Sequence, residues 1–424
     1  MNFLQLTHLL PWPPVDGGKK GILGFVEGYR RHPAVERHSL ISMCPQSQFH
    51  WAQEWKPEGE QPQFDVFDTR NRILPFLQNT AFSTQPYNMA KYQRPSFARL
   101  VEAAIARRVP DVVHLDGAHT SYYAPLVRRL APDALRILRC HNAEHVILER
   151  LANTEKNPLK RALLGIQARR LKRYEAAALD NFDLILAITD VDAERFRAMN
   201  PRSEERMIVI PAGADIPSEL PPLPRKGAGP LRIVHIAAMD WLPNQAGLRW
   251  LVNQVLPLLE AAGLDYHLDA VGKNMPDEFL RMNNPRVTVH GFVQDLRPIT
   301  SAAHLAVVPL HVGGGMRVKI LDYWSMGIPV VATRVGAEGL TDGGAIALAD
   351  EPGDFAAAIR RLADDDAELE RLRQTGFSKV AASYGWPALV DKVITQVEKL
   401  RSRRITEADA QRALSPASAL STNV

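Results

Sequence analysis

The sequence contains few cysteines and no long apolar run, and both features limit the classes of protein to which it can belong. Its 424 residues include only two cysteines, Cys44 and Cys140, which argues against a disulfide framework and structural zinc and for a reducing compartment. No run of about eighteen apolar residues is present, so the sequence predicts no membrane-spanning helix. Residues 1–14 lack a basic leader and lead directly into a strand pattern, so they do not resemble a signal peptide. We therefore expect a cytoplasmic protein.

The net charge is also small. The chain has 51 Lys and Arg against 47 Asp and Glu, which gives +4 and a pI near 9.0. This mild excess suits anionic small molecules or an anionic membrane surface, and it is too weak to argue for nucleic acid. An ordinary, slightly basic cytosolic protein is equally compatible. At 46% hydrophobic residues, the chain is long enough for two domains with full cores.

Short apolar runs alternate with helical patterns along the whole chain. Helical patterns at 95–108 and 192–199 separate apolar runs, which predicts parallel sheets joined by crossover helices. The expected strands are 3–9, 39–43, 64–67, 112–115, 137–140, 184–188, 208–210, 232–238, 266–271, 287–290, 305–310 and 329–333.

A stretch rich in Pro and Gly, residues 214–230, divides the chain as a linker would. We therefore expect an N-terminal domain over 1–213 and a second domain over 231–385. A last helix is predicted at 386–400. Residues 401–424 contain few large apolar side chains and are expected to form a mobile tail.

The segment 304–340 organises the second domain. A buried strand leads into three consecutive glycines, Gly313, Gly314 and Gly315, and a helix is predicted to open near Met316. Glycines at such a turn let the backbone approach a ligand, and the N–H groups and dipole of the helix start attract anions. Neither a Gly-Lys-Ser/Thr sequence nor GxGxxG spacing is present. The pattern predicts a phosphate or diphosphate site of another kind, although glycine turns before helices also occur for purely structural reasons.

Polar residues follow two expected strands of the first domain. One group contains Asp116 and His119, and the other contains His141, Asn142 and Glu144. Ligands of open α/β sheets bind outside the carboxyl ends of strands, so both groups are candidates for a site. A histidine in a loop is more often a structural residue, and placement at a strand end is what favours a functional role for His141.

The loop after the first strand contains Asp16, Gly17, Gly18 and Lys19, and a helix is expected from Gly21. Glycines here serve a tight turn from strand to helix whether or not a ligand binds. The same loop would also let a ligand approach the backbone closely.

The segment 304–340 resembles the donor-binding core of family 4 glycosyltransferases, which are retaining enzymes of the GT-B fold with two facing Rossmann-like domains. Asp322 stands at the second acidic position of the family's motif, residues 327–331 give its Gly-x-Pro-Val-Val, and residues 336–340 give Gly-x-Glu-Gly-Leu. The first glutamate is replaced by Gly314, which fits a branch with Gly-Gly-Gly-x-Arg-x-Lys in this loop.

The resemblance implies roles for individual residues. In most members, the loop corresponding to 238–248 supplies an arginine and a lysine to the donor diphosphate, and this chain has neither there. The diphosphate charge is therefore expected to be met by Arg317 and Lys319, with no metal and no cofactor. The implied catalytic residues are His141, Arg317 and Lys319. The implied donor-binding residues are Gly313, Gly314, Gly315, Asp322, Gly272, Phe292 and Val293. The implied acceptor-side residues are Asp16, Gly17, Gly18 and Asp116.

The resemblance implies a hexosyltransferase that moves a sugar from a nucleoside-diphosphate sugar to a saccharide or lipid-linked acceptor with retention. Such an enzyme would serve the assembly of cell-surface polysaccharide or glycolipid. A GT-B epimerase would need several acid or base groups around the sugar, and a non-catalytic relative would have little need to keep Arg317, Lys319 and His141 together. Both alternatives stay open beside the transferase. In this fold the last helix, 386–400, commonly crosses back to the first domain.

Residues 156–173 form an unusually basic amphipathic pattern. A helix of this kind rests on anionic lipid in some proteins, and a peripheral contact with the inner face of a membrane would suit a lipid-linked acceptor. A solvated basic face explains the pattern equally simply.

Overall fold

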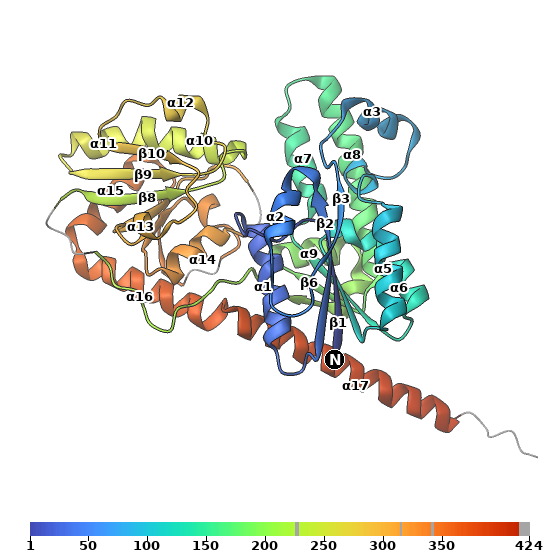
Figure 1. The fold of residues 1–424 in the computed structure, drawn as a ribbon. Helices are drawn as coiled ribbons and strands as arrows, with labels where there is room; N and C mark the ends of the chain where they lie inside the picture. Colours follow the sequence, from blue (N-terminus) through green and yellow to red (C-terminus); the bar gives the residue numbers. More distant parts are fainter. Residues whose placement is uncertain (225–228, 314–315, 341–342, 415–424) are drawn as a thin grey trace, which may run out of the picture.

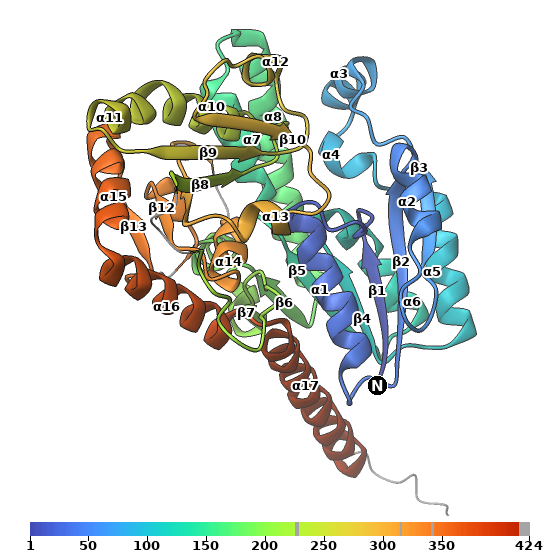
Figure 2. The same cartoon turned by 60° about the vertical axis from the view of Figure 1, so that its left-hand side comes forward.

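The structure is a computed structural model that describes residues 1–224, 229–313, 316–340 and 343–414. It contains two α/β domains, each built on a parallel sheet with helices on both faces (Figures 1 and 2). The expected fold class, GT-B with two Rossmann-like domains, is confirmed.

The sheet of the first domain has seven parallel strands in the order β3-β2-β1-β4-β5-β6-β7. Its strands are β1 (Asn2–Thr7), β2 (Arg37–Pro45), β3 (Gln63–Phe67), β4 (Val112–Asp116), β5 (Leu135–Cys140), β6 (Leu184–Ala187) and β7 (Met207–Val209). Its helices are α1 (Gly17–Arg31), α2 (Phe49–Glu54), α3 (Ile73–Phe82), α4 (Tyr87–Ala90), α5 (Pro95–Arg107), α6 (Ala124–Leu130), α7 (Glu144–Thr154), α8 (Pro158–Ala178) and α9 (Asp190–Met199).

The second sheet has six parallel strands in the order β10-β9-β8-β11-β12-β13. The strands are β8 (Leu231–Ile236), β9 (Tyr266–Val271), β10 (Val287–Gly291), β11 (Leu305–Val308), β12 (Val330–Ala332) and β13 (Ile346–Leu348). The helices are α10 (Leu242–Trp250), which continues through a π-helical turn (Leu251–Val255) into α11 (Leu256–Ala261), then α12 (Asp277–Leu280), α13 (Arg297–Thr300), α14 (Val318–Ser325), α15 (Pro352–Asp364) and α16 (Asp366–Ser383).

Both sheets bury apolar side chains on their two faces. In the first sheet, Val113 and Leu115 of β4 join the core under α5 and α6, whereas Val112 joins the core under α1 and the C-terminal helix. Burial on both faces explains why these strands are nearly continuous apolar runs in the sequence. The strand order reverses between β1 and β4 and between β8 and β11. The loops after these strands therefore border the crevice where such sheets bind ligands.

The C-terminal helix α17 (Trp386–Leu414) returns to the first domain and packs against α1. Trp386 is buried, and Gly24 and Gly213 leave room for its ring, because a Cβ at either position would collide with it. A single bridge pairs Ala214 with Gly385, so the two connections between the domains lie side by side. The exact limits of the domains and of the linker at 214–230 stay a prediction.

The expected mobile tail is wrong for residues 401–414, which continue α17. Two arginines fasten this part of the helix to the first domain: Arg401 Nη2 lies 2.8 Å from Asp111 Oδ1, and Arg404 Nη2 lies 2.6 Å from Asp183 Oδ1. Residues 415–424 of the predicted tail lie outside the described residues.

Two helices begin earlier than predicted. Asp16 accepts a hydrogen bond from Lys19 N at 3.0 Å and thereby caps α1, so Gly17 and Gly18 belong to the first helical turn and not to a loop. Helix α10 begins at Leu242, inside the segment 238–248 that was expected to be a loop, with Pro243 in its first turn, where proline is well tolerated.

Candidate active site

The glycine segment follows β11, and all four residues of this strand are buried. Gly313 has φ +139°, and a Cβ there would lie 2.7 Å from the Trp241 ring, so glycine is required. Gly314 and Gly315 lie outside the described residues. Helix α14 begins at Val318, two residues after the predicted start, and Arg317 directly precedes it.

The two expected cations stand at the start of α14. Arg317 is only 5% exposed, its guanidinium lies 5.6 Å from the centre of the Trp241 ring, and its Nε donates to Val335 O at 3.2 Å. Lys319 Nζ donates to Asn244 Oδ1 at 3.3 Å. The segment 238–248, which lacks cations, thus supplies the indole of Trp241 before α10 and the amide of Asn244 in its first turn, and these contact the two side chains.

The environment of Lys319 lowers the proton affinity of its amino group. Burial, followed by the positive charge of Arg317, lowers the pKa of Lys319 to about 7, while Asp322 acts in the opposite direction. Burial also lowers the pKa of Arg317, which stays a cation at neutral pH. A ligand with negative charge would restore the proton of Lys319.

Asp322 faces the first domain. Its Oδ2 lies 2.5 Å from Lys20 Nζ of α1, and burial raises the pKa of Asp322 although Lys20 opposes this. Beside this pair, a Cβ on Gly17 would lie 3.1 Å from Val318. The capped start of α1 and the start of α14 therefore pack together across the two domains. The predicted acceptor loop thus meets the predicted donor helix.

A second cluster lies at the carboxyl ends of β4 and β5. His141 Nε2 lies 2.5 Å from Asp116 Oδ1, and Asp116 also accepts from Gln5 Nε2 at 3.0 Å and lies 3.5 Å from Arg139 Nη1. Burial alone would raise the pKa of Asp116, but its interactions with His141 and Arg139 hold it well below its usual range. Because the ionised carboxylate can only accept, Nε2 of His141 carries a proton and Nδ1 is left for a ligand.

His8 joins this cluster and was not expected from the sequence. Its Nδ1 donates to Asp116 O at 3.0 Å, and its ring stacks on His119 with centroids 4.6 Å apart. Burial, followed by His141, lowers the pKa of His8 to about 4. The ring is therefore neutral, and its Nε2 is a hydrogen-bond acceptor. His8 is the first residue after β1, but the expected strand 3–9 placed it inside the strand, so the strand-end rule that selected Asp116 and His141 did not find it.

Family models of glycosyltransferases match both domains. Residues 56–217 match the model described as Glycosyltransferase Family 4, and residues 230–365 match the model described as Glycosyl transferases group 1. The chain is a family 4-like glycosyltransferase. A search of curated proteins finds no match.

Solved structures share the GT-B fold of this glycosyltransferase. Sucrose-phosphate synthase from Thermosynechococcus elongatus has a TM-score of 0.66 and 16% identity, covering 95% of this chain and 100% of that chain. HepE from Anabaena in complex with UDP-glucose has a TM-score of 0.62 and 14% identity, with 94% and 99% covered. A glycosyltransferase from Rickettsia africae has a TM-score of 0.61 and 14% identity, with 94% and 98% covered. At these identities, the likeness concerns the fold alone.

Some predicted site residues have different surroundings from those expected. Asp116 was predicted to lie on the acceptor side. It is fully buried and pairs with His141, so its carboxylate is not exposed to an acceptor. A Cβ on Gly272 would collide with Ala237 O, which gives this glycine a packing role after β9. Phe292 is 61% exposed and follows β10 together with Val293, at the carboxyl edge of the second sheet.

Glu144 is a further acid or base candidate. Burial, followed by the charge of Glu175, raises the pKa of Glu144 to about 7. The two Glu175 carboxylate oxygens accept from the backbone N–H groups of Glu144 and His145, at 2.8 and 3.1 Å, and so hold the start of α7. This fixes the helix that follows His141.

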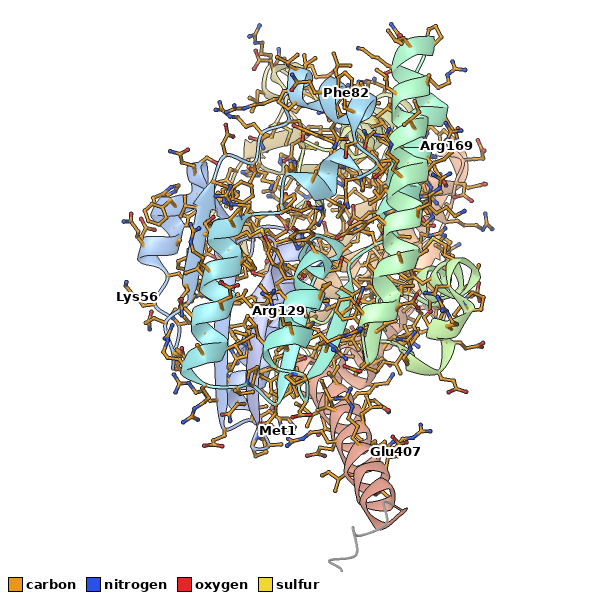
Figure 3. The ribbon with its side chains drawn as sticks, turned by 90° about the vertical axis from the view of Figure 1, so that its right-hand side faces the viewer. Met1, Lys56, Phe82, Arg129, Arg169 and Glu407 are labelled. Carbon is orange, nitrogen blue, oxygen red and sulfur yellow. The ribbon has the colours of Figure 1, made fainter. Side chains whose placement is uncertain are left out.

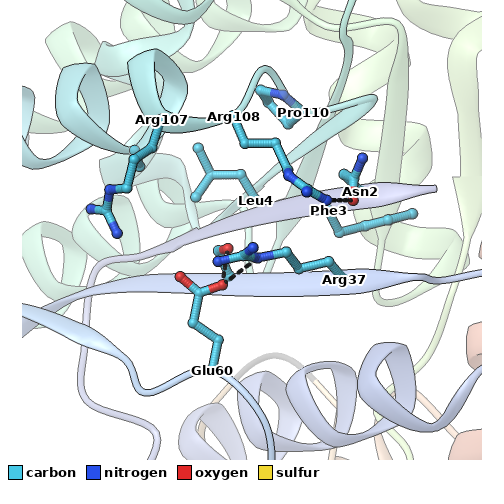
Figure 4. Close-up of a pocket in the computed structure, with 10 residues that line it drawn as sticks. Asn2, Phe3, Leu4, Arg37, Glu60, Arg107, Arg108 and Pro110 are labelled. Carbon is cyan, nitrogen blue, oxygen red and sulfur yellow. Dashed lines mark hydrogen bonds and ion pairs between the residues drawn. The ribbon is translucent and has the colours of Figure 1, made fainter.

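The small pocket in Figure 4 lies away from these clusters, near the amino ends of β1 and β2. It holds about 30 Å³, and Arg37 is paired there with Glu60 at 2.7 Å. A space of this size accommodates a water molecule and not a sugar nucleotide. The candidate site is therefore placed at the two side-chain clusters, at the start of α14 and at the carboxyl ends of β4 and β5.

Proposed function

We propose that this glycosyltransferase moves a hexose from a nucleoside-diphosphate sugar to a saccharide or lipid-linked acceptor with retention of configuration. One observation carries the proposal: contacts between the domains join the start of α14, with its two cations, to α1 of the domain that contains the His141–Asp116 pair. Gly17 packs on Val318, and Lys20 pairs with Asp322. The complexes of Anabaena HepE with UDP and with UDP-glucose support a donor of this class.

The chemistry follows from the charges. When the bond between the anomeric carbon and the diphosphate oxygen breaks, negative charge grows on the leaving phosphate. Fixed cations stabilise this charge without reorganising, and we assign that role to Arg317 and Lys319. The acceptor oxygen forms the new bond to the anomeric carbon on the face that the phosphate leaves, and the departing phosphate takes the proton of the acceptor hydroxyl. Nδ1 of His141 would accept from a hydroxyl of the donor sugar, and Asp322 from the ribose.

We propose that no divalent cation is needed, since Arg317 and Lys319 supply the positive charge that a metal supplies in other transferases. Turnover should therefore persist in EDTA. A loss that Mg²⁺ or Mn²⁺ restores would contradict this part of the proposal.

A groove beside the acceptor loop suits a saccharide chain. It holds about 600 Å³ and extends from Trp12, in the loop between β1 and α1, past Trp55 to Arg30 and Arg37. Trp12 is 36% exposed and lies parallel to Trp55, with ring centroids 6.5 Å apart. Aromatic faces and charged groups that donate and accept hydrogen bonds are the usual lining of a saccharide site. We propose the assembly of cell-surface polysaccharide or glycolipid as the setting.

A peripheral membrane contact through residues 156–173 is part of the proposal. In the described part of the chain, no helix has the length and apolarity needed to cross a bilayer. Helix α3 next to α8 exposes large apolar side chains, among them Ile73 at 80% and Phe82 at 90% (Figure 3). Exposed apolar side chains on α3, together with exposed Lys160 and Arg161 on the neighbouring α8, suit an anionic lipid surface. The fraction of protein that sediments with phosphatidylglycerol vesicles should be several-fold lower for Phe82→Ser than for the wild-type protein. Val109→Ser, which changes another exposed apolar side chain, is the control and should sediment as the wild-type protein does.

The experiment measures release of nucleoside diphosphate from UDP-, GDP- and ADP-sugars, with and without a membrane lipid extract. The native chain is compared with Arg317→Ala and with the control Arg297→Ala, whose side chain is 89% exposed. Removing a buried cation from the leaving phosphate should lower turnover about 100- to 1,000-fold. The control should keep its activity, and NMR of the product should show the anomeric configuration of the donor.

The alternatives give other results. A GT-B epimerase would convert the nucleotide sugar without releasing diphosphate and without an acceptor. Tight binding of nucleotide with no turnover under any condition would refute the transferase and support a non-catalytic relative.

A further inference from the structure

Helix α7 brings an arginine of the first domain to the glycine segment of the second. The helix begins at Glu144, shortly after His141, and Arg150 stands six residues further on, about 9 Å along the axis. The Arg150 Nη1 group donates to the carbonyl oxygen of Gly313, and the side chain is 40% exposed. Arg150 therefore lies at the crevice, on the segment from which the diphosphate site is predicted.

Glu338 joins two arginines from different domains. Its Oε2 lies 3.6 Å from Arg317 Nη2, and its Oε1 lies 3.9 Å from Arg150 Nη2. Neither distance is that of a close hydrogen bond, so one carboxylate is shared loosely by two cations. Two guanidinium groups this close repel each other unless more negative charge is present.

Three basic side chains, Arg150, Arg317 and Lys319, gather around the start of α14. Glu338 lies near two of them, and Asp322 is paired with Lys20 at 2.5 Å. The diphosphate of a nucleotide sugar carries two negative charges, which suit such a cluster of basic side chains.

We propose that Arg150 is a ligand of the donor diphosphate contributed by the opposite domain, and that Glu338 holds Arg150 and Arg317 in place until the donor binds. This inference rests on the proposed function and adds a residue to it. A guanidinium can donate hydrogen bonds to two phosphate oxygens at once, whereas the Gly313 carbonyl offers only one acceptor oxygen. The diphosphate then joins both domains, so binding of the donor and closure of the crevice are one event.

A purely structural role makes a different prediction. If Arg150 only fastens the domains through the Gly313 carbonyl, its removal weakens every ligand of the crevice equally, with or without phosphate. If Arg150 binds the diphosphate, its removal weakens ligands in proportion to their phosphate charge.

The test is calorimetry with a nucleoside, its monophosphate and its diphosphate, in the uridine, guanosine or adenosine series that the wild-type protein prefers. Arg150→Ala should raise the Kd of the diphosphate about 10- to 100-fold, raise that of the monophosphate less, and leave the nucleoside within twofold. Arg150→Lys, which keeps charge but loses the paired donors, should fall between them. The control is Arg169→Ala on the exposed face of α8, which removes the same charge elsewhere (Figure 3).

Salt provides a second measurement. Without Arg150, the diphosphate affinity should depend less steeply on salt concentration, because one fewer charge is neutralised on binding. Equal losses for all three ligands, or no loss for the diphosphate, would overturn the inference. If Arg317→Ala loses diphosphate binding while Arg150→Ala does not, the proposed function stands and only this inference fails. If the wild-type protein binds none of the three diphosphates, both fail.

Discussion

The protonation of Lys319 should make donor affinity depend on pH. Burial, followed by Arg317, lowers the pKa of Lys319 to about 7 in the free protein. A diphosphate favours the ammonium form, so the bound side chain keeps a proton that the free one loses as pH rises. Affinity must therefore fall with rising pH. If the pKa in the complex lies well above 9, the Kd should rise about tenfold between pH 6 and pH 8, which is about 1.4 kcal/mol.

The assay is calorimetry of an intact nucleotide sugar at pH 6, 7, 8 and 9. Its phosphates stay ionised throughout, whereas a terminal phosphate titrates near pH 6 and would obscure the effect. Lys319→Arg is the matched control, because arginine keeps its charge at all these pH values. The pKa of Glu144 is also raised to about 7, by burial and by Glu175, so Glu144→Gln is measured in parallel.

The expected result is a steep pH dependence in the wild-type protein and in Glu144→Gln, and a flat one in Lys319→Arg. A wild-type Kd that stays within twofold between pH 6 and pH 8.5 would refute the reasoning. The reasoning would also be refuted if the donor Kd still depended on pH in Lys319→Arg and no longer did so in Glu144→Gln. That result would identify Glu144, in the first domain, as the titrating group.

Four further outcomes are expected. Asp116→Asn should lower kcat about 10- to 100-fold through the lost orientation of His141, with the donor Kd unchanged by calorimetry. His8→Asn keeps a donor for the Asp116 carbonyl but loses the acceptor Nε2, so kcat/KM should fall about tenfold. His8→Gln should recover part of the lost activity. Trp386→Ala should cost about 3–5 kcal/mol in urea unfolding, because the ring fills the space over α1. Lys319→Met should raise the free energy of unfolding at pH 7 by about 1–3 kcal/mol while abolishing donor binding.

The sheets could be predicted because their strands are buried on both faces. All four residues of β11 are buried and apolar, so this strand appears in the sequence as an apolar run. The start of α1 was missed because Gly17 and Gly18 look like loop residues. Gly17 fits against Val318 of the other domain, and Asp16 caps the helix. Local propensity contains no information about the contact with Val318. The cap by Asp16 is a local signal that sequence reasoning could have used.

The candidate site was predictable only one domain at a time. Motif and strand-end position select Arg317 and His141, because each stands at a definable place on its own sheet. The contacts that join the sheets were not predictable. Lys20 and Asp322 are 302 residues apart in sequence, and Arg150 and Gly313 are 163 apart, so neither pair has a periodicity or a spacing. The lowered pKa of Lys319 likewise depends on burial, which appears only in the folded chain.

This chain departs from the family pattern at Gly314 and in the segment 238–248. These departures are better explained by other residues binding the diphosphate than by a loss of diphosphate binding. A lysine whose pKa falls to about 7 costs folding stability at neutral pH, because the unfolded chain holds that proton more tightly. This cost persists below pH 7 and fades as pH rises toward the usual lysine pKa. A protein without a ligand for Lys319 would lose nothing by replacing it with an apolar residue. Asn244 instead accepts a hydrogen bond from Lys319, and Trp241 lies against the guanidinium of Arg317; both residues belong to the segment 238–248, which lacks cations. Destabilising groups that are held in place with such support are typical of sites that bind.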